Sequence, residues 1–160
     1  MKKLGFALPA LGLVALVAAT AALAAPVKIV PFNAKYAGQA STKVDGNTAT
    51  IAATGTGVAS TIGVGKITGA GTGDSSQQPC VPFGGLGSMT GVKGTISYKL
   101  TSGASGCGDD GGHVFTVSGH ATILKATGAL AKAKGILKFT GIYNRDDGTF
   151  SVKFTGTLTK

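Results

Sequence analysis

The chain has 160 residues, of which 13% are charged and 43% are hydrophobic. This composition excludes an intrinsically disordered protein. Its 27 glycines follow no Gly-X-Y period, which excludes a collagen-like chain. The formal net charge is +9, all six acidic residues are Asp, and the length suits one domain.

The N-terminus has the pattern of a secretory signal peptide. Two lysines precede the apolar stretch 4–23, which ends in the cleavage pattern Ala22-Leu23-Ala24. We therefore expect residues 1–24 to be removed and 25–160 to be exported, to the periplasm or the medium, with a net charge of +7. A retained membrane anchor is the alternative, because the stretch is long enough to span a bilayer. After cleavage, no integral membrane domain is expected.

Nearly every segment of the remaining chain alternates with period two, as half-buried strands do. In the last segment Phe150, Val152 and Phe154 share one face, opposite a row of Ser, Lys and Thr. The only helical candidate, 126–134, is too short for more than a turn or two. The predicted strands lie near 30–44, 48–59, 62–71, 89–101, 113–124, 135–144 and 148–159.

Cys80 and Cys107 are the only two cysteines, and in an exported chain such a pair predicts a disulfide. Because they flank the strand 89–101, a simple path would place them at opposite ends of it. A short extra strand at 78–83, turning back through 84–87 and running antiparallel to 89–101, brings both to one end.

The extra strand brings the total to eight, an even number that closes an antiparallel up-and-down β-barrel without edges. Apolar side chains form the continuous inner face, and Thr, Ser and Lys form the outer face. A membrane barrel presents apolar side chains to lipid instead. The sequence thus predicts an all-β, water-soluble barrel over 25–160.

Three glycine-rich segments near the C-terminus carry a family resemblance: 128–135 (GALAKAKG), 135–141 and 148–158. They resemble the allene oxide cyclase and dirigent-like barrels, which include small secreted bacterial members. The resemblance implies a barrel with a central apolar cavity and, in some members, cyclisation or coupling chemistry. Plant cyclases use a Glu in the cavity, which this chain lacks, and Leu130 stands where the family often has an aromatic residue. The resemblance therefore implies fold rather than activity.

Residues with catalytic or metal-binding chemistry are sparse. His113 and His120 are seven residues apart on one predicted strand, so they face opposite sides and cannot share a metal. The Gly-rich segments precede no helix that would orient amides on a phosphate. We expect no catalytic residues, no cofactor and no confident metal site.

The interior is the expected ligand site. We expect a non-catalytic protein that binds a small apolar ligand, and a cavity above about 300 Å³ would favour this. A cyclase or isomerase using the same cavity is one alternative. An envelope or surface protein working through its Thr- and Lys-rich outer face, with a packed interior, is the other. The expected cavity residues are Phe32, Tyr36, Tyr98, Phe115, Phe139 and Phe154.

Charged residues suggest two further contacts. Strict strand alternation puts every Asp-bearing connection at one end of the barrel, an acidic rim that would attract a cation. Lysines on the outer face favour solubility, with weak contact to an anionic polymer or the envelope as the alternative. A single arginine argues against specific nucleic-acid binding. The rim residues are Asp45, Asp74, Asp109, Asp110, Asp146 and Asp147.

Overall fold

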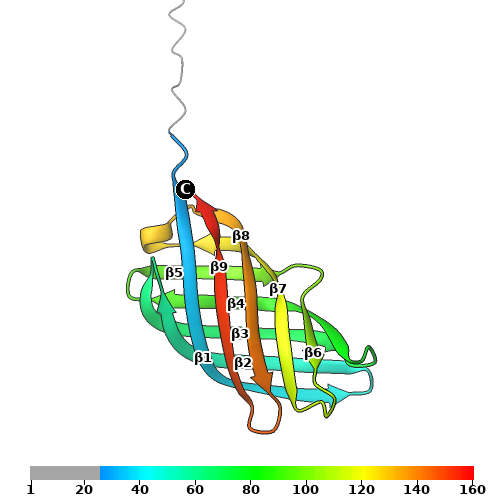
Figure 1. Cartoon of the computed structure of the whole chain (residues 1–160). Coiled ribbons are helices and arrows are strands. Elements are labelled where there is room, and N and C mark those ends of the chain that lie inside the picture. Colours follow the sequence, from blue (N-terminus) through cyan, green and yellow to red (C-terminus); the bar gives the residue numbers. More distant parts are fainter. Residues whose placement is uncertain (1–25) are drawn as a thin grey trace, which may run out of the picture.

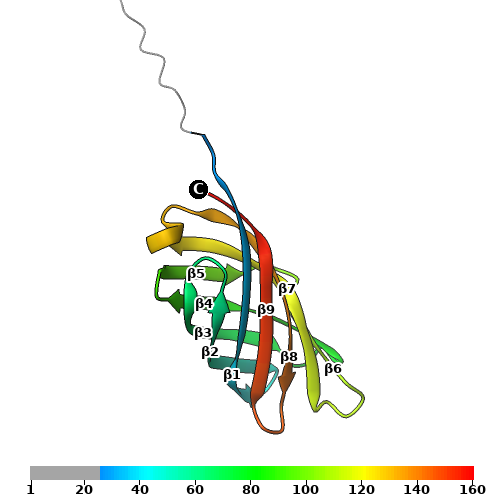
Figure 2. The same cartoon turned by 60° about the vertical axis from the view of Figure 1, so that its left-hand side comes forward.

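Nine strands and one short 3-10 helix make up residues 26–160, the part of the chain that this computed structural model describes (Figures 1 and 2). The expected signal peptide lies outside these described residues. The elements are β1 Ile29–Asp45, β2 Thr48–Ala59, β3 Gly63–Asp74, β4 Cys80–Gly91, β5 Gly94–Leu100, β6 Ser105–Gly108, β7 Val114–Ala126, η1 Gly128–Leu130, β8 Lys134–Asn144 and β9 Thr149–Thr159.

The strands close into an antiparallel barrel. β1 pairs with both β2 and β9, and β3 pairs with β4, so every strand has a hydrogen-bonded neighbour on both sides. β5 and β6 share one position, since each pairs with β4 on one side and β7 on the other. The barrel therefore has eight strand positions, as predicted. No helix among the described residues is long and apolar enough to cross a membrane.

The predicted turn at 84–87 is wrong. These residues lie inside β4 and pair with β3, and the chain reverses at Val92-Lys93 instead. The predicted single strand 89–101 is accordingly divided between β4 and β5, and Val92, in the turn between them, is 82% exposed.

Close packing between strands explains why glycines occupy the middle of β4. A methyl group on Gly85 would overlap the carbonyl oxygen of Ala70 on β3. Only glycine fits at position 87 for the same reason, because an added methyl group would overlap the Tyr98 hydroxyl. Glycines that indicate a turn in the sequence here permit the close approach of a backbone and a ring.

The predicted disulfide between Cys80 and Cys107 is present, with a Cα–Cα distance of 3.9 Å. The two cysteines are direct cross-strand partners on β4 and β6. The predicted pairing of 78–83 with 89–101 is wrong, since Cys80 to Pro82 pair with β6. β6 was not expected, because its sequence Ser-Gly-Cys-Gly carries no apolar alternation.

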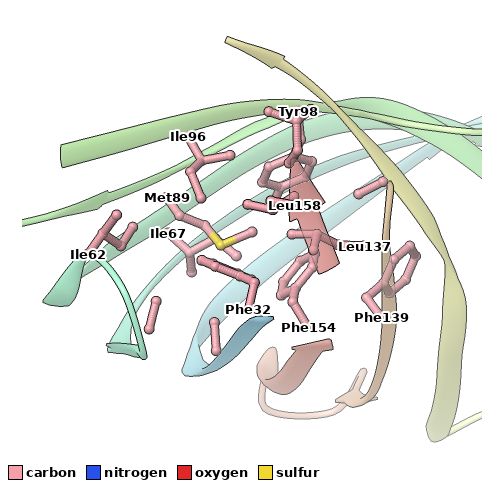
Figure 3. Packing of buried hydrophobic residues seen from close by; sticks show 14 of the residues in the cluster. Phe32, Ile62, Ile67, Met89, Ile96, Tyr98, Leu137, Phe139, Phe154 and Leu158 are labelled. Carbon is pink, nitrogen blue, oxygen red and sulfur yellow. The ribbon is translucent and has the colours of Figure 1, made fainter. Parts of the chain in front are cut away.

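The interior is filled at one end of the barrel only. We call this the closed end; its connections are 60–62, 92–93 and 127–133. The opposite end, the mouth, has the connections 46–47, 75–79, 109–113 and 145–148, toward the right and bottom of Figure 1. Side chains with almost no exposed surface pack tightly at the closed end: Leu130, and, labelled in Figure 3, Phe32, Ile62, Met89, Ile96, Leu137 and Leu158.

Candidate ligand cavity

An apolar cavity of about 430 Å³ lies between the closed end and the mouth. Its floor is a row of aromatic rings across the barrel. The ring centres of Tyr98 and Phe154 are 5.5 Å apart, those of Phe154 and Phe139 are 5.8 Å apart, and those of Phe139 and Phe83 are 6.3 Å apart. In the buried cluster, Tyr98 lies near Leu158, and Phe139 and Phe154 lie near Leu137 (Figure 3). These rings separate the filled half from the hollow half.

Small inward residues on β1, β2 and β3 create the open volume. Ala40, Ala53 and Gly69 are cross-strand neighbours in one continuous row, and all three line the cavity. Side chains of this size cannot reach the barrel axis, so they leave space that Phe or Leu would fill. Val44 faces inward at the mouth and is 50% exposed, which shows that the cavity opens to solvent there.

Four of the six expected cavity residues line this space: Tyr98, Phe115, Phe139 and Phe154. Phe32 and Tyr36 are instead buried outside the cavity lining. The period-two pattern indicates only that a side chain points inward. It does not indicate depth, which depends on the tilt and register of the strands. Further lining residues that the expectation omitted include Val81, Phe83, Leu100, Phe150 and Val152.

The side chains inside the cavity are uncharged. Burial, with a further contribution from the neighbouring Tyr36, raises the pKa of Tyr98, so this phenol stays neutral. Burial also raises the pKa of Tyr36, whose hydroxyl is buried and has no hydrogen-bond partner among the described residues. The residues lining the cavity in the described chain include no Asp and no His, and their one charged side chain, Arg145, is at the mouth.

All six Asp residues of the expected acidic rim lie at the mouth, in its connections or at the strand ends beside them. Asp74 accepts hydrogen bonds from Ser76 and Gln77, and these bonds lower its pKa. Asp147 accepts from the amide and hydroxyl of Thr149, which likewise lower its pKa. Within residues 26–160, no three Asp, His or Cys side chains are grouped to hold a metal ion.

One ion pair joins two loops of the mouth. The Nδ1 atom of His113 lies 2.9 Å from Oδ1 of Asp146, and the amide of His113 donates to Asp109. The hydrogen bond to Asp146 is the main reason that the pKa of His113 is raised. Arg145 donates its amide to the carbonyl oxygen of His113, so the same contact holds the residue that lines the mouth.

The Asp146→Asn variant is expected to lower the pKa of His113 toward its ordinary value, because the charged partner is lost. Because the pKa of His113 is raised in the folded protein, the His113–Asp146 pair contributes its full stabilisation of the fold below a pH of about 6.5. This stabilisation is lost as the pH rises through the raised pKa of His113. An NMR titration of the His113 ring measures the shift, with the His120 ring as internal control. An unchanged His113 midpoint in the variant would contradict the pairing.

Comparison with known proteins gives no further guide to this site: no family model, no curated protein and no solved structure matches the chain. The function must therefore be inferred from the cavity and from the charges around its mouth.

Proposed function

We propose that the chain is an exported binding protein that holds a small apolar ligand in the barrel cavity and leaves it chemically unchanged. The observation that carries this proposal is the cavity of about 430 Å³, lined mainly by aliphatic and aromatic side chains and open at one end. Ligand sites usually measure about 300–1,000 Å³ and are mostly apolar with few polar groups. The disulfide agrees with an oxidising, exported location.

The lining favours binding over catalysis. General acid–base chemistry requires a group whose pKa lies near the working pH. The titratable groups within the described lining are Tyr98, whose pKa is raised further from neutrality, Tyr143, and Arg145 at the mouth. The resemblance to allene oxide cyclase-like barrels is part of this proposal at the level of architecture, a barrel with an apolar cavity, and not of activity.

An open cavity also weighs against a role confined to the outer surface. A protein that works only through its outer wall gains stability by filling its interior, because each cavity forfeits packing contacts. Here the closed end is filled and the mouth end is not, although residues larger than Ala40, Ala53 and Gly69 would fill it. We take the retained space as the ligand site.

A filling variant with a matched control tests the proposal. Ala40→Leu places a larger side chain in the cavity, whereas Ala37→Leu places the same side chain on the outer face of the same strand. Titration with the neutral fluorescent probe N-phenyl-1-naphthylamine measures affinity. We expect Ala40→Leu to weaken binding at least about ten-fold, and Ala37→Leu to change it less than about two-fold. Equal affinities in both variants, or no binding by the unmodified protein, would contradict the proposal.

A further inference from the structure

The charges are unevenly distributed along the barrel axis. All six Asp residues lie at the mouth, and the one ion pair among the described residues, His113 with Asp146, is there too. Lys28, Lys93 and Lys160 belong to the closed end, where the described chain contains no acidic residue to pair with them. The closed end therefore carries an excess of positive charge, even with the α-carboxylate of Lys160 counted.

Exposed aliphatic side chains accompany these lysines. Ile29 is 67% exposed, Val64 is 65% exposed, and Val92 is the most exposed large hydrophobic side chain in the described residues. Val92 directly precedes Lys93, and Ile29 directly follows Lys28. Other exposed aliphatic residues lie along the wall and near the mouth, but these three occur together with lysines at the end that lacks Asp.

Hydrogen bonds place the segments that carry these residues next to one another. Lys28 and Lys160 exchange two backbone hydrogen bonds of 2.9 and 2.8 Å, and the Lys160 ammonium group donates to the carbonyl oxygen of Ala129. The Ala129 amide donates in turn to the carbonyl oxygen of Lys93. The Val92 amide completes the series by donating to the carbonyl oxygen of Val64.

We propose that this surface, formed by Lys28, Ile29, Val64, Val92, Lys93 and Lys160, docks the protein on an anionic lipid bilayer. Lysines next to a negatively charged leaflet gain electrostatic energy, while adjacent aliphatic side chains enter the interface. A soluble polyanion would engage the lysines and leave the aliphatic side chains in water. The six Asp residues then lie at the end farthest from the negative surface.

The position of the N-terminus agrees with this orientation. The described chain enters the barrel at the closed end, beside the C-terminus (Figure 1). The apolar stretch 4–23 is thus joined to the barrel at the proposed docking surface. A copy that kept this stretch as an anchor would present the same surface to the lipid. Docking in this way leaves the cavity mouth free, so the inference is independent of ligand binding.

Vesicle flotation tests the inference with the chain that begins at Ala25, which contains every strand of the closed barrel. Vesicles of phosphatidylcholine with about 30% phosphatidylglycerol are expected to bind the protein, and pure phosphatidylcholine vesicles are not. Val92→Ser combined with Lys93→Gln should lower the partition coefficient about 25-fold, since the lost lysine and the lost aliphatic contact each contribute about five-fold.

Ile142→Ser combined with Lys43→Gln is the matched control. It removes one exposed aliphatic side chain and one positive charge near the mouth, and it should change partitioning less than about two-fold. The inference is overturned if both pairs of substitutions weaken binding equally, or if no vesicle binds. Binding to soluble dextran sulfate without binding to vesicles would also overturn it, in favour of a polyanionic partner. None of these outcomes affects probe binding in the cavity.

Discussion

Phe154→Ala should lower the free energy of unfolding by about 3–5 kcal/mol, the cost of removing a large buried aromatic side chain. Phe154 is 3% exposed and stands in the middle of the aromatic floor, between Tyr98 and Phe139. Its removal would join the ligand cavity to the packed closed end. We therefore expect the variant to accept bulkier apolar probes while it unfolds at a lower concentration of urea.

Phe115→Ala is the control for this effect. Phe115 also lines the cavity, but it is only half-buried and lies nearer the mouth. Its removal should cost less than half as much as that of Phe154, because fewer contacts are lost. A cost below about 1 kcal/mol for Phe154→Ala would show that the rings do not form a packed floor.

Replacing both cysteines by alanine should lower the free energy of unfolding by about 3.5 kcal/mol in the chain-entropy model of disulfide stabilisation. The bridge joins residues 27 apart and ties the short strand β6 to β4. Val81 and Gly106, direct partners on these strands, line the cavity, so the loss should also weaken probe binding.

Reduction of the unmodified protein provides an independent comparison. The reduced chain should unfold at the same urea concentration as the Cys80→Ala, Cys107→Ala variant, because both lack only the cross-link. If reduction moves the free energy of unfolding by less than about 0.5 kcal/mol, then the disulfide does not hold the mouth in the way that the pairing of β4 and β6 indicates.

The sequence was sufficient to predict the class of fold and the number of strand positions, although not how residues 78–108 divide into strands. Alternation such as Phe150, Val152 and Phe154 specifies which side chains point inward, and an inward apolar face with no helical period leaves few architectures. The disulfide could be predicted because only two cysteines exist. The turn positions were predicted less well, since residues 84–87 have the composition of a turn, whereas Gly85 and Gly87 allow β4 to lie close to β3 and to Tyr98.

The depth of each inward residue could not be predicted. Phe32 and Phe154 both face the interior, but only Phe154 lines the cavity. Which inward residues share a level depends on strand tilt and on the stagger between neighbours, and both follow from register rather than from alternation. β6 could not be predicted from alternation either, because its four residues pair through their backbone and contribute little apolar surface.

Native mass spectrometry of the protein, purified from its own host and then mixed with small apolar compounds, tests the proposed ligand cavity most directly. We predict one non-covalently bound molecule per chain, which is released on collisional activation and is excluded by Ala40→Leu but not by Ala37→Leu. A protein that stays bare under both conditions, or an adduct that Ala40→Leu retains in full, would contradict a ligand site inside the barrel.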